Sequence, residues 1–285
     1  MPYDTTGKVT LDHIYTQPDP RAYFTTLRGL DYCVPQLAEP HFADLISHLH
    51  ASLGRTVRVL DMGCSYGINA TLLNGGATMA ELYHWYGDPD AHAMDHDALL
   101  DRDRKRFADH RKRARIVGLD SSQPALDYAY TAGILDDAVC ADLETNELTE
   151  LQRAQLSGTD LVISTGCIGY VGAQTVTQLA TIDEDRMPWM AHFVLRMVPF
   201  EPIEKNLSAL GYEVERVDSL FRQRRFVSDE EQAQVMDTLH AQGIDPHGLE
   251  DTGWLYAQLH LCRPPSSVDS TAATDNVAGQ HLRQG

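Results

Sequence analysis

The stretch VRVLDMGCSYGINATLL, residues 57–73, decides the fold that the sequence predicts. Its first half is apolar and β-branched, which is typical of a buried strand. It then reaches Asp61 and a turn that contains Gly63 and Gly67. Glycine permits positive φ and the close approach of a ligand, and the helix that follows presents unpaired N–H groups at its start. The stretch therefore predicts a strand, a tight turn and a helix, with either a ligand at the turn or a plain connection.

Short apolar segments recur along the chain and alternate with helical patterns. The seven expected strands are 57–62, 114–120, 137–143, 159–166, 191–200, 212–220 and 253–264. Such alternation predicts a parallel sheet with crossover helices. Near-continuous Val, Ile and Leu in the early segments is what a sheet covered on both faces requires. We therefore expect an α/β fold with a doubly wound, mostly parallel, seven-stranded sheet over residues 54–263.

Several segments lie outside this alternation. Residues 1–53 are expected to form a helical N-terminal extension, and 75–113 a polar, helical insert. Residues 221–250 begin with FRQRRF and continue as a helix. The segment 264–285 has few large apolar residues, so it cannot bury enough surface to offset its ordering entropy, and we expect a disordered tail.

The composition disfavours some classes of partner. The chain has 285 residues, 43% hydrophobic and 22% charged, which is enough for an ordinary soluble core. Its net charge of −18 repels phosphate backbones, whose attraction supplies most nonspecific affinity for nucleic acids. No apolar run has the length of a membrane span or a signal peptide, and the five cysteines form no CxxC pair. We expect a cytoplasmic protein with reduced thiols, and no nucleic-acid or membrane partner.

Three acids stand at the ends of three successive predicted strands. Asp61 ends the first, Asp120 ends the second and Asp142 follows the third. A single aspartate at a strand end is usually a helix cap or a loop charge. A carboxylate at the end of the second strand of a doubly wound sheet, however, accepts hydrogen bonds from ribose hydroxyls. Three such acids together favour a nucleoside-binding crevice.

These motifs resemble those of class I, Rossmann-like S-adenosylmethionine-dependent methyltransferases, which have a seven-stranded sheet. VLDMGCSYG looks like their first motif, VGLDSS their second, ADLE their third and DLVISTGCIGY their fourth. The resemblance covers roughly residues 57–200. Ser65 departs from the pattern, because many members have glycine there. A GxGxxG spacing is absent, so a nicotinamide dinucleotide is disfavoured.

The resemblance implies S-adenosyl-L-methionine as cofactor and assigns it a set of residues. The turn 63–67 would lie against the methionine part, with Asp61 as a polar anchor behind it. Asp120 would hold the ribose, 142–143 would flank the adenine, and 165–166 would face the sulfonium. The implied cofactor-binding residues are Asp61, Gly63, Cys64, Ser65, Tyr66, Gly67, Asn69, Asp120, Ser121, Asp142, Leu143, Thr165 and Gly166.

The expected reaction is methyl transfer to an O, N or S nucleophile of a small, natural-product or amino-acid-like metabolite. The fourth motif lacks the Asn- or Asp-Pro-Pro-aromatic sequence of enzymes that methylate exocyclic amino groups of bases. Two alternatives remain open. One is an azetidine-forming type of enzyme, which cyclises or eliminates the aminocarboxypropyl group and releases methylthioadenosine. The other is a non-catalytic, cofactor-binding scaffold.

Catalytic residues are harder to assign, because the activated methyl group needs only an aligned nucleophile and a site without water. The candidates are Tyr15 and Arg21 in the N-terminal extension, which could act as a lid, and Tyr170. Alternatively, the aromatic residues of the extension only pack it onto the domain. The arginines of FRQRR, residues 222–225, either meet an anionic substrate or balance the acidic surface.

No metal site is expected. His92 and His96 have the i, i+4 spacing of metal ligands on one helix face, with Asp95 between them, but a solvated helix face is the simpler interpretation. Cys167 could be nucleophilic, although a small packed residue is the commoner case.

Overall fold

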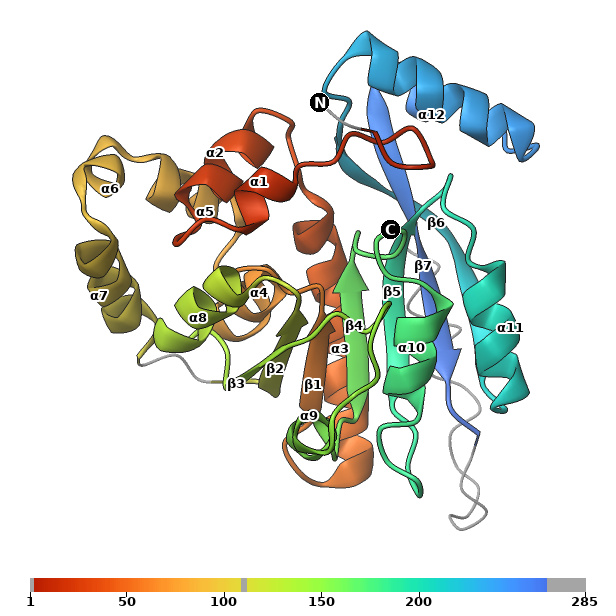
Figure 1. The fold of residues 1–285 in the computed structure, drawn as a ribbon, viewed down its shortest axis with the longest axis horizontal. Helices are drawn as coiled ribbons and strands as arrows, with labels where there is room; N and C mark the ends of the chain where they lie inside the picture. The colour runs from red at the N-terminus through yellow and green to blue at the C-terminus, as the bar shows by residue number, and fades with distance from the viewer. Residues whose placement is uncertain (1–2, 109–111, 266–285) are drawn as a thin grey trace.

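A computed structural model describes residues 3–108 and 112–265. Its centre is one seven-stranded sheet of order β3-β2-β1-β4-β5-β7-β6 (Figure 1). Only β7 runs antiparallel to its neighbours, β5 and β6. The expected α/β architecture with a mostly parallel sheet is confirmed. The strands are β1 (Arg58–Met62), β2 (Arg115–Asp120), β3 (Asp137–Cys140), β4 (Leu161–Thr165), β5 (Trp189–Leu195), β6 (Glu213–Arg225) and β7 (Trp254–Arg263).

Helices cover both faces of the sheet. Helices α3, α4 and α8 pack on one face, and α9, α10 and α11 on the other (Figure 1). The helices are α1 (Asp12–Tyr15), α2 (Arg21–Arg28), α3 (Val34–Leu53), α4 (Ile68–Gly75), α5 (Met79–Gly87), α6 (Pro89–Ala93), α7 (His96–Phe107), α8 (Gln123–Thr131), α9 (Glu150–Leu156), α10 (Ala173–Ala180), α11 (Glu201–Ala209) and α12 (Asp229–Ala241), with a short 3₁₀ turn η1 (Glu250–Thr252).

Successive residues of the inner strands serve the two faces in turn. Val59 of β1 packs in the core with α3 and α4, whereas the next residue, Leu60, packs in the core with α10 and α11. Because a strand's side chains alternate between faces, both positions must be apolar in a sheet covered on both sides. This explains the near-continuous apolar sequence of the early strands.

The N-terminal extension and the insert are helical, as expected. Residues of α2 and α5 pack together, so the extension rests on the insert. The first described residues form a small hairpin-like bridge between Tyr3 and Val9. This segment lies against α12, where a Cβ on Gly7 would come within 2.7 Å of the Gln234 Cβ. The N-terminal and C-terminal parts of the chain therefore meet at one end of the molecule (Figure 1).

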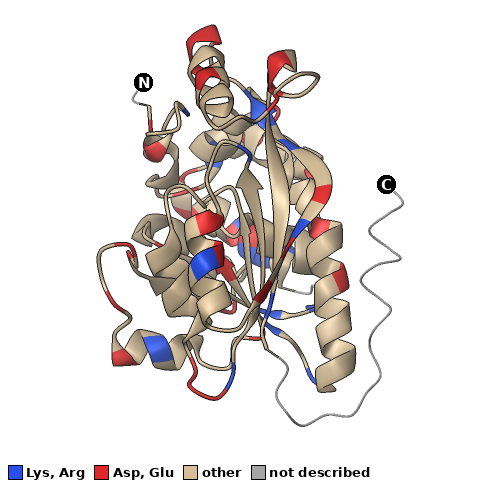
Figure 2. Cartoon of the chain, turned by 90° about the vertical axis from the view of Figure 1, so that its right-hand side faces the viewer, with Lys and Arg blue, Asp and Glu red and all other residues tan. Residues whose placement is uncertain are grey.

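The FRQRRF segment differs from the prediction. We expected β6 to end at residue 220, but the strand continues to Arg225, paired with β7 up to Trp254. It is the edge strand of the sheet, and exposed charged side chains are common at such an edge. Acidic and basic segments are interspersed along this strand and the helices in Figure 2. Because most residues of 221–225 are charged, a search for apolar segments did not identify this part of the strand.

The last part of the predicted tail, 266–285, lies outside the described residues. Within the part of the chain that the structure describes, no helix is both long and apolar enough to cross a membrane.

Candidate functional site

A cavity of about 520 Å³ lies at the carboxyl ends of β1, β2 and β4. This is where the strand order changes direction, because β1 lies between β2 and β4. In open α/β sheets, ligands bind at such a point. The predicted residues that line the cavity are Tyr15, Gly63, Cys64, Ser65, Asn69, Asp120, Ser121, Asp142, Leu143, Thr165, Gly166 and Tyr170. Arg21, Asp61, Tyr66 and Gly67 do not line it.

The turn after β1 has left-handed backbone at three positions. Gly63 has φ 69°, Ser65 49° and Gly67 75°. A Cβ on Gly63 would come within 2.5 Å of the Cys167 Cβ in the loop after β4. Glycine is therefore required at this position by both conformation and space, whereas Ser65 holds a conformation that costs an L-residue free energy.

Asp120 fastens this turn to the end of β2. Its Oδ2 accepts a hydrogen bond from the Ser65 N–H at 2.8 Å, and its Oδ1 accepts one from the Ser122 N–H at 2.9 Å. Burial raises the pKa of this carboxyl, although the backbone hydrogen bonds oppose that shift. Each carboxylate oxygen can accept a second hydrogen bond, so Asp120 can still receive two hydroxyl groups.

Asp61 lies behind the cavity wall and is fully buried. Its Oδ1 accepts a hydrogen bond from Asn69 Nδ2 at 2.9 Å, and the same amide reaches the Thr165 hydroxyl at 3.2 Å. Asp61 Oδ2 and the Ser65 hydroxyl are buried without a partner among the described residues. Burial raises the pKa of Asp61 to about 7. Two unpaired oxygens beside one turn fit a ligand with hydrogen-bond donors.

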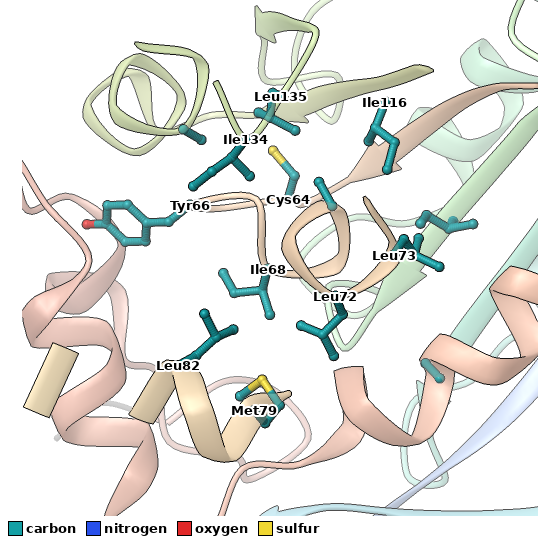
Figure 3. Close-up of a cluster of buried hydrophobic side chains, with 14 of the residues drawn as sticks. Cys64, Tyr66, Ile68, Leu72, Leu73, Met79, Leu82, Ile116, Ile134 and Leu135 are labelled. Carbon is teal, nitrogen blue, oxygen red and sulfur yellow. The ribbon is translucent and has the colours of Figure 1, made fainter. Parts of the chain in front are cut away.

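The side chains of Cys64 and Tyr66 belong to the buried hydrophobic cluster around the start of α4, with Cys64 beside Leu135 and Tyr66 directed toward the N-terminal extension (Figure 3). The Tyr66 hydroxyl donates hydrogen bonds to the carbonyls of Gln17 at 2.8 Å and Ile14 at 3.2 Å. A Cβ on Gly67 would come within 2.7 Å of Ile134. The sequence thus correctly predicted the turn at Tyr66 and Gly67. Neither residue lines the cavity, and the Tyr66 side chain contacts the extension instead. The labelled core residues around them are Ile68, Leu72, Leu73, Met79, Leu82, Ile116, Ile134 and Leu135.

The loop after β3 forms the end of the cavity that was predicted for adenine. The exposed Asp142 carboxylate accepts hydrogen bonds from the Glu144 N–H at 3.1 Å and the Thr145 hydroxyl at 2.7 Å. The Thr145 contact is the main reason why its pKa is lowered. Leu143 is buried beside it. Glu144 in turn accepts a hydrogen bond from the Gly172 N–H at 2.8 Å, which ties this loop to the one after β4.

We use the term floor for the turn 63–67 together with Asp61, Asn69 and Asp120. We call the roof the segment 3–17 with the end of β6. Tyr15 belongs to the roof, and its carbonyl accepts a hydrogen bond from the Ser122 hydroxyl at 2.6 Å. Burial raises the pKa of Tyr15 to about 12, so its phenol is protonated at neutral pH.

Arg21, in contrast, is used elsewhere. Its guanidinium pairs with Asp19 at 2.7 Å and donates hydrogen bonds to the carbonyls of Ala91 at 3.1 Å and Met94 at 2.8 Å. It connects the extension to the insert and lies outside the cavity. Arg21, a catalytic candidate from the sequence, therefore makes contacts between the extension and the insert and none with the cavity.

Two residues of the roof, Lys8 and Gln223, were not assigned to the site from the sequence, and Arg224 was left open between meeting an anionic substrate and balancing the acidic surface. Gln223 and Arg224 are consecutive and both buried, because a bulge in β6 between Arg222 and Arg224 breaks the alternation of faces. Arg224 forms a buried ion pair with Glu231 at 2.6 Å, so it does not balance the surface charge. Only 8% of Lys8 is exposed. Nothing in the polar sequence around Lys8 indicates this burial.

The histidine pair of the insert does not lie on one helix face. His92 belongs to α6 and His96 to α7, and Asp95 caps the start of α7 by accepting a hydrogen bond from the Ala98 N–H at 2.8 Å. In the described ranges 3–108 and 112–265, no group of three or more His, Cys, Asp or Glu side chains is arranged to hold a metal ion.

No family model matches the sequence, and no curated protein matches it. Among solved structures, the plantazolicin methyltransferase BamL in complex with a triazolic desmethylPZN analog and SAH is similar at 13% identity and a TM-score of 0.41, over 78% of this chain and 83% of that chain. A functionally unknown protein from Deinococcus radiodurans R1 is similar at 16% identity and a TM-score of 0.37, over 73% and 80%. Similarity at this level does not establish an activity for this chain.

Proposed function

We propose that this protein binds S-adenosylmethionine at the cavity and transfers its methyl group to an O, N or S nucleophile of a small metabolite. The observation that supports this most is the floor. A glycine turn, the strand-end carboxylate of Asp120 and the unpaired Ser65 hydroxyl line one cavity where the strand order changes, and the unpaired Asp61 Oδ2 lies behind its wall. Its volume of about 520 Å³ lies in the range of small-molecule sites.

The residues present fit this cofactor. Asp120 has free lone pairs for the ribose hydroxyls, and the 142–143 pair lies where the adenine would be flanked. Asp61 Oδ2 and the Ser65 hydroxyl can accept hydrogen bonds from an ammonium group. The glycines at 63 and 166 leave room that side chains would fill, since a Cβ on Gly166 would come within 2.4 Å of Gln223 Nε2. When bound, the sulfonium supplies a methyl group that is already activated.

The remaining task of the protein is to position the nucleophile and exclude water. Tyr15, the buried Tyr23 and the partly buried Tyr32 close the roof side of the cavity with aromatic surface. Tyr170, 43% exposed, forms part of its rim. Burial raises the pKa of the Tyr170 phenol, so at neutral pH it is a hydrogen-bond donor and not a general base.

One observation favours the cyclising alternative. In that reaction the amino group of S-adenosylmethionine must lose a proton, form a bond to the carbon that carries the sulfonium and displace methylthioadenosine. A buried carboxyl with a pKa of about 7 can accept that proton, and Asp61 lies behind the turn that we propose for the amino-acid arm. Methyl transfer to a separate acceptor does not require this group as a base.

Calorimetry with S-adenosylhomocysteine tests the cofactor site. Asp120→Ala should weaken binding by roughly 1–3 kcal/mol, because charge-assisted hydrogen bonds are lost. Asp127→Ala is the matched control, since Asp127 lies exposed on the neighbouring helix α8 and is not part of the cavity lining. Absence of binding by the wild type would refute the proposal.

The products separate the reactions. After incubation with S-adenosylmethionine and a set of small metabolites, S-adenosylhomocysteine indicates methyl transfer. Methylthioadenosine formed with the cofactor alone indicates cyclisation or elimination. Tight cofactor binding with neither product would support a scaffold.

A further inference from the structure

Lys8 and Gln223 are buried polar residues of the roof whose hydrogen-bonding or charge requirements are unmet. Lys8 is 8% exposed and lines the cavity. Within the described residues its ammonium forms no ion pair, and its Nζ lies over the Tyr170 ring, 4.4 Å from the centroid. Gln223 is 3% exposed, lines the same cavity and has no described partner for its Oε1. Burying such groups costs free energy unless a partner is present.

The charges around Lys8 do not supply that partner. Arg224 and Glu231 neutralise each other, and Glu231 also accepts hydrogen bonds from the N–H groups of Val9 and Val227, both at 2.7 Å. Asp4 accepts hydrogen bonds from Thr6 and from the Lys8 N–H. Burial and the nearby Arg224 lower the pKa of Lys8 to about 8, against the weaker attraction of Asp4 and Glu231. A ligand anion would restore the favourable environment of the ammonium.

Lys8 and Gln223 belong to the roof, whereas the ribose and amino-acid contacts that we propose for the cofactor belong to the floor. Thr165 contacts the floor through Asn69, whereas the next residue, Gly166, contacts Gln223 on the roof. Tyr170, whose ring lies beneath the Lys8 Nζ, belongs to the loop that follows β4. Lys8 and Gln223 therefore line the cavity beside the end of β4 and the loop that follows it.

We propose that the acceptor carries a carboxylate that binds Lys8, and that a donor on the same molecule reaches Gln223 Oε1. This inference rests on the proposed function and names the class of its substrate. The carboxylates that line the cavity do not prevent such binding. Asp12 and Asp142 are exposed, Asp120 is held by the N–H groups of Ser65 and Ser122, and Glu144 is held by Gly172 and Thr175. Lys8 is thus a buried cation without an ion pair among the described residues, whereas Arg224, the other described cation of the lining, is paired with Glu231.

The test compares small carboxylic acids with their amides, which differ only in charge. Benzoate and benzamide, phenylacetate and phenylacetamide, and N-acetyltyrosine and its amide are titrated into protein saturated with S-adenosylhomocysteine, with binding followed by ligand-observed NMR. In the wild type at least one acid should bind about tenfold more tightly than its amide, as a charge-assisted hydrogen bond implies. Lys8→Met should abolish this preference, and Lys8→Arg should keep most of it.

Lys205→Met is the matched control, because it removes the same charge from the exposed face of α11. It should leave the preference for acids unchanged. If acids and amides bind wild type equally, or if Lys8→Met keeps the preference, the proposal is wrong. It is also wrong if Lys8→Met weakens S-adenosylhomocysteine itself about tenfold, because Lys8 would then hold the cofactor's own carboxylate.

A second measurement does not depend on the folding of a variant. Reductive methylation with ¹³C-formaldehyde gives each lysine an NMR signal whose shift follows its ionisation. The signal of Lys8 should titrate at higher pH when the preferred acid is added, since an anion stabilises the ammonium. An unchanged titration would contradict the inference. Failure of wild type to bind S-adenosylhomocysteine would instead refute the proposed function, and this inference with it.

Discussion

The floor and the roof of the cavity are built in different ways. The floor comes from residues 61–69 and the end of β2, and backbone groups hold it together: the Gly63 N–H donates to the Leu119 carbonyl at 2.8 Å. The roof joins Val9 to Glu231, 222 residues away, and the buried ion pair of Glu231 with Arg224 holds it together. The floor is therefore specified by a glycine turn and backbone groups at the ends of neighbouring strands, and the roof by a buried ion pair between distant segments.

The largest effect is expected for Glu231→Gln in the roof. Its carboxylate accepts two hydrogen bonds from Arg224 and one each from the N–H groups of Val9 and Val227. The substitution leaves a buried guanidinium without an anion, so the free energy of unfolding should fall by about 3–5 kcal/mol in urea titrations. The double variant Arg224→Met/Glu231→Leu should recover part of that loss, because no charge stays unpaired.

Asp31→Asn is the control for this prediction. It breaks the pair with Arg225, whose side chains are 50% and 57% exposed, so the cost should stay below about 1 kcal/mol. Equal losses for the two variants would show that the roof does not depend on its buried ion pair.

Gly63→Ala tests the floor. The new Cβ meets the Cys167 Cβ at 2.5 Å in a backbone with φ 69°, so both strain and a clash are expected. The free energy of unfolding should fall by roughly 2–4 kcal/mol, and binding of S-adenosylhomocysteine should be lost. Gly76→Ala has a similar φ of 62° with nothing within 4 Å, so it reports the strain alone, at about 1–2 kcal/mol. Identical losses of stability at the two glycines would mean that the floor can move away from the new alanine side chain.

The pH dependence of stability tests the buried acid of the floor. Asp61 has its pKa raised from 3.8 to about 7 by burial, so between these values the folded state binds more protons than the unfolded state. This group therefore lowers the free energy of unfolding as pH rises through that window. Asp61→Asn removes the contribution, and at about pH 8 it should be more stable than wild type by ~1–2 kcal/mol while binding S-adenosylhomocysteine less well. Urea titrations across the window that run parallel for both proteins would contradict this.

The smallest effect is expected for Ser65→Gly. Glycine relieves the backbone at φ 49° but adds freedom to the unfolded chain, so the free energy of unfolding should change by less than about 1 kcal/mol. Loss of the unpaired hydroxyl should weaken S-adenosylhomocysteine by roughly 0.5–1.5 kcal/mol in calorimetry. An unchanged affinity for S-adenosylhomocysteine would show that the Ser65 hydroxyl does not contribute to binding.

The sequence predicted the sheet and the floor because both leave local signals. Alternating apolar segments indicated the seven strands, and the spacing of Gly63, Gly67 and the strand-end acids indicated the turn and the cavity. Side-chain direction was less predictable: Tyr66 looked like a ligand contact and is a core residue, since its hydroxyl bonds to the carbonyls of Ile14 and Gln17 in the extension.

The roof could not be predicted for a physical reason. Gln223 and Arg224 face inward together only because β6 carries a bulge, and the bulge depends on pairing with β7. Lys8 is buried only because the first residues lie against α12. Neither arrangement produces a periodic pattern in the sequence, and a run of arginines at a sheet edge looks like solvated charge.

The hydrogen bond from the Val9 N–H to Glu231 has a consequence for how small molecules enter and leave. Lifting the first residues would strip a donor from a buried carboxylate, which is a costly movement. Substrate and product should instead pass over the exposed rim at Asp12, Ser121 and Tyr170. These surface side chains then form the entrance to the cavity, and the N-terminal residues form a fixed cover above it.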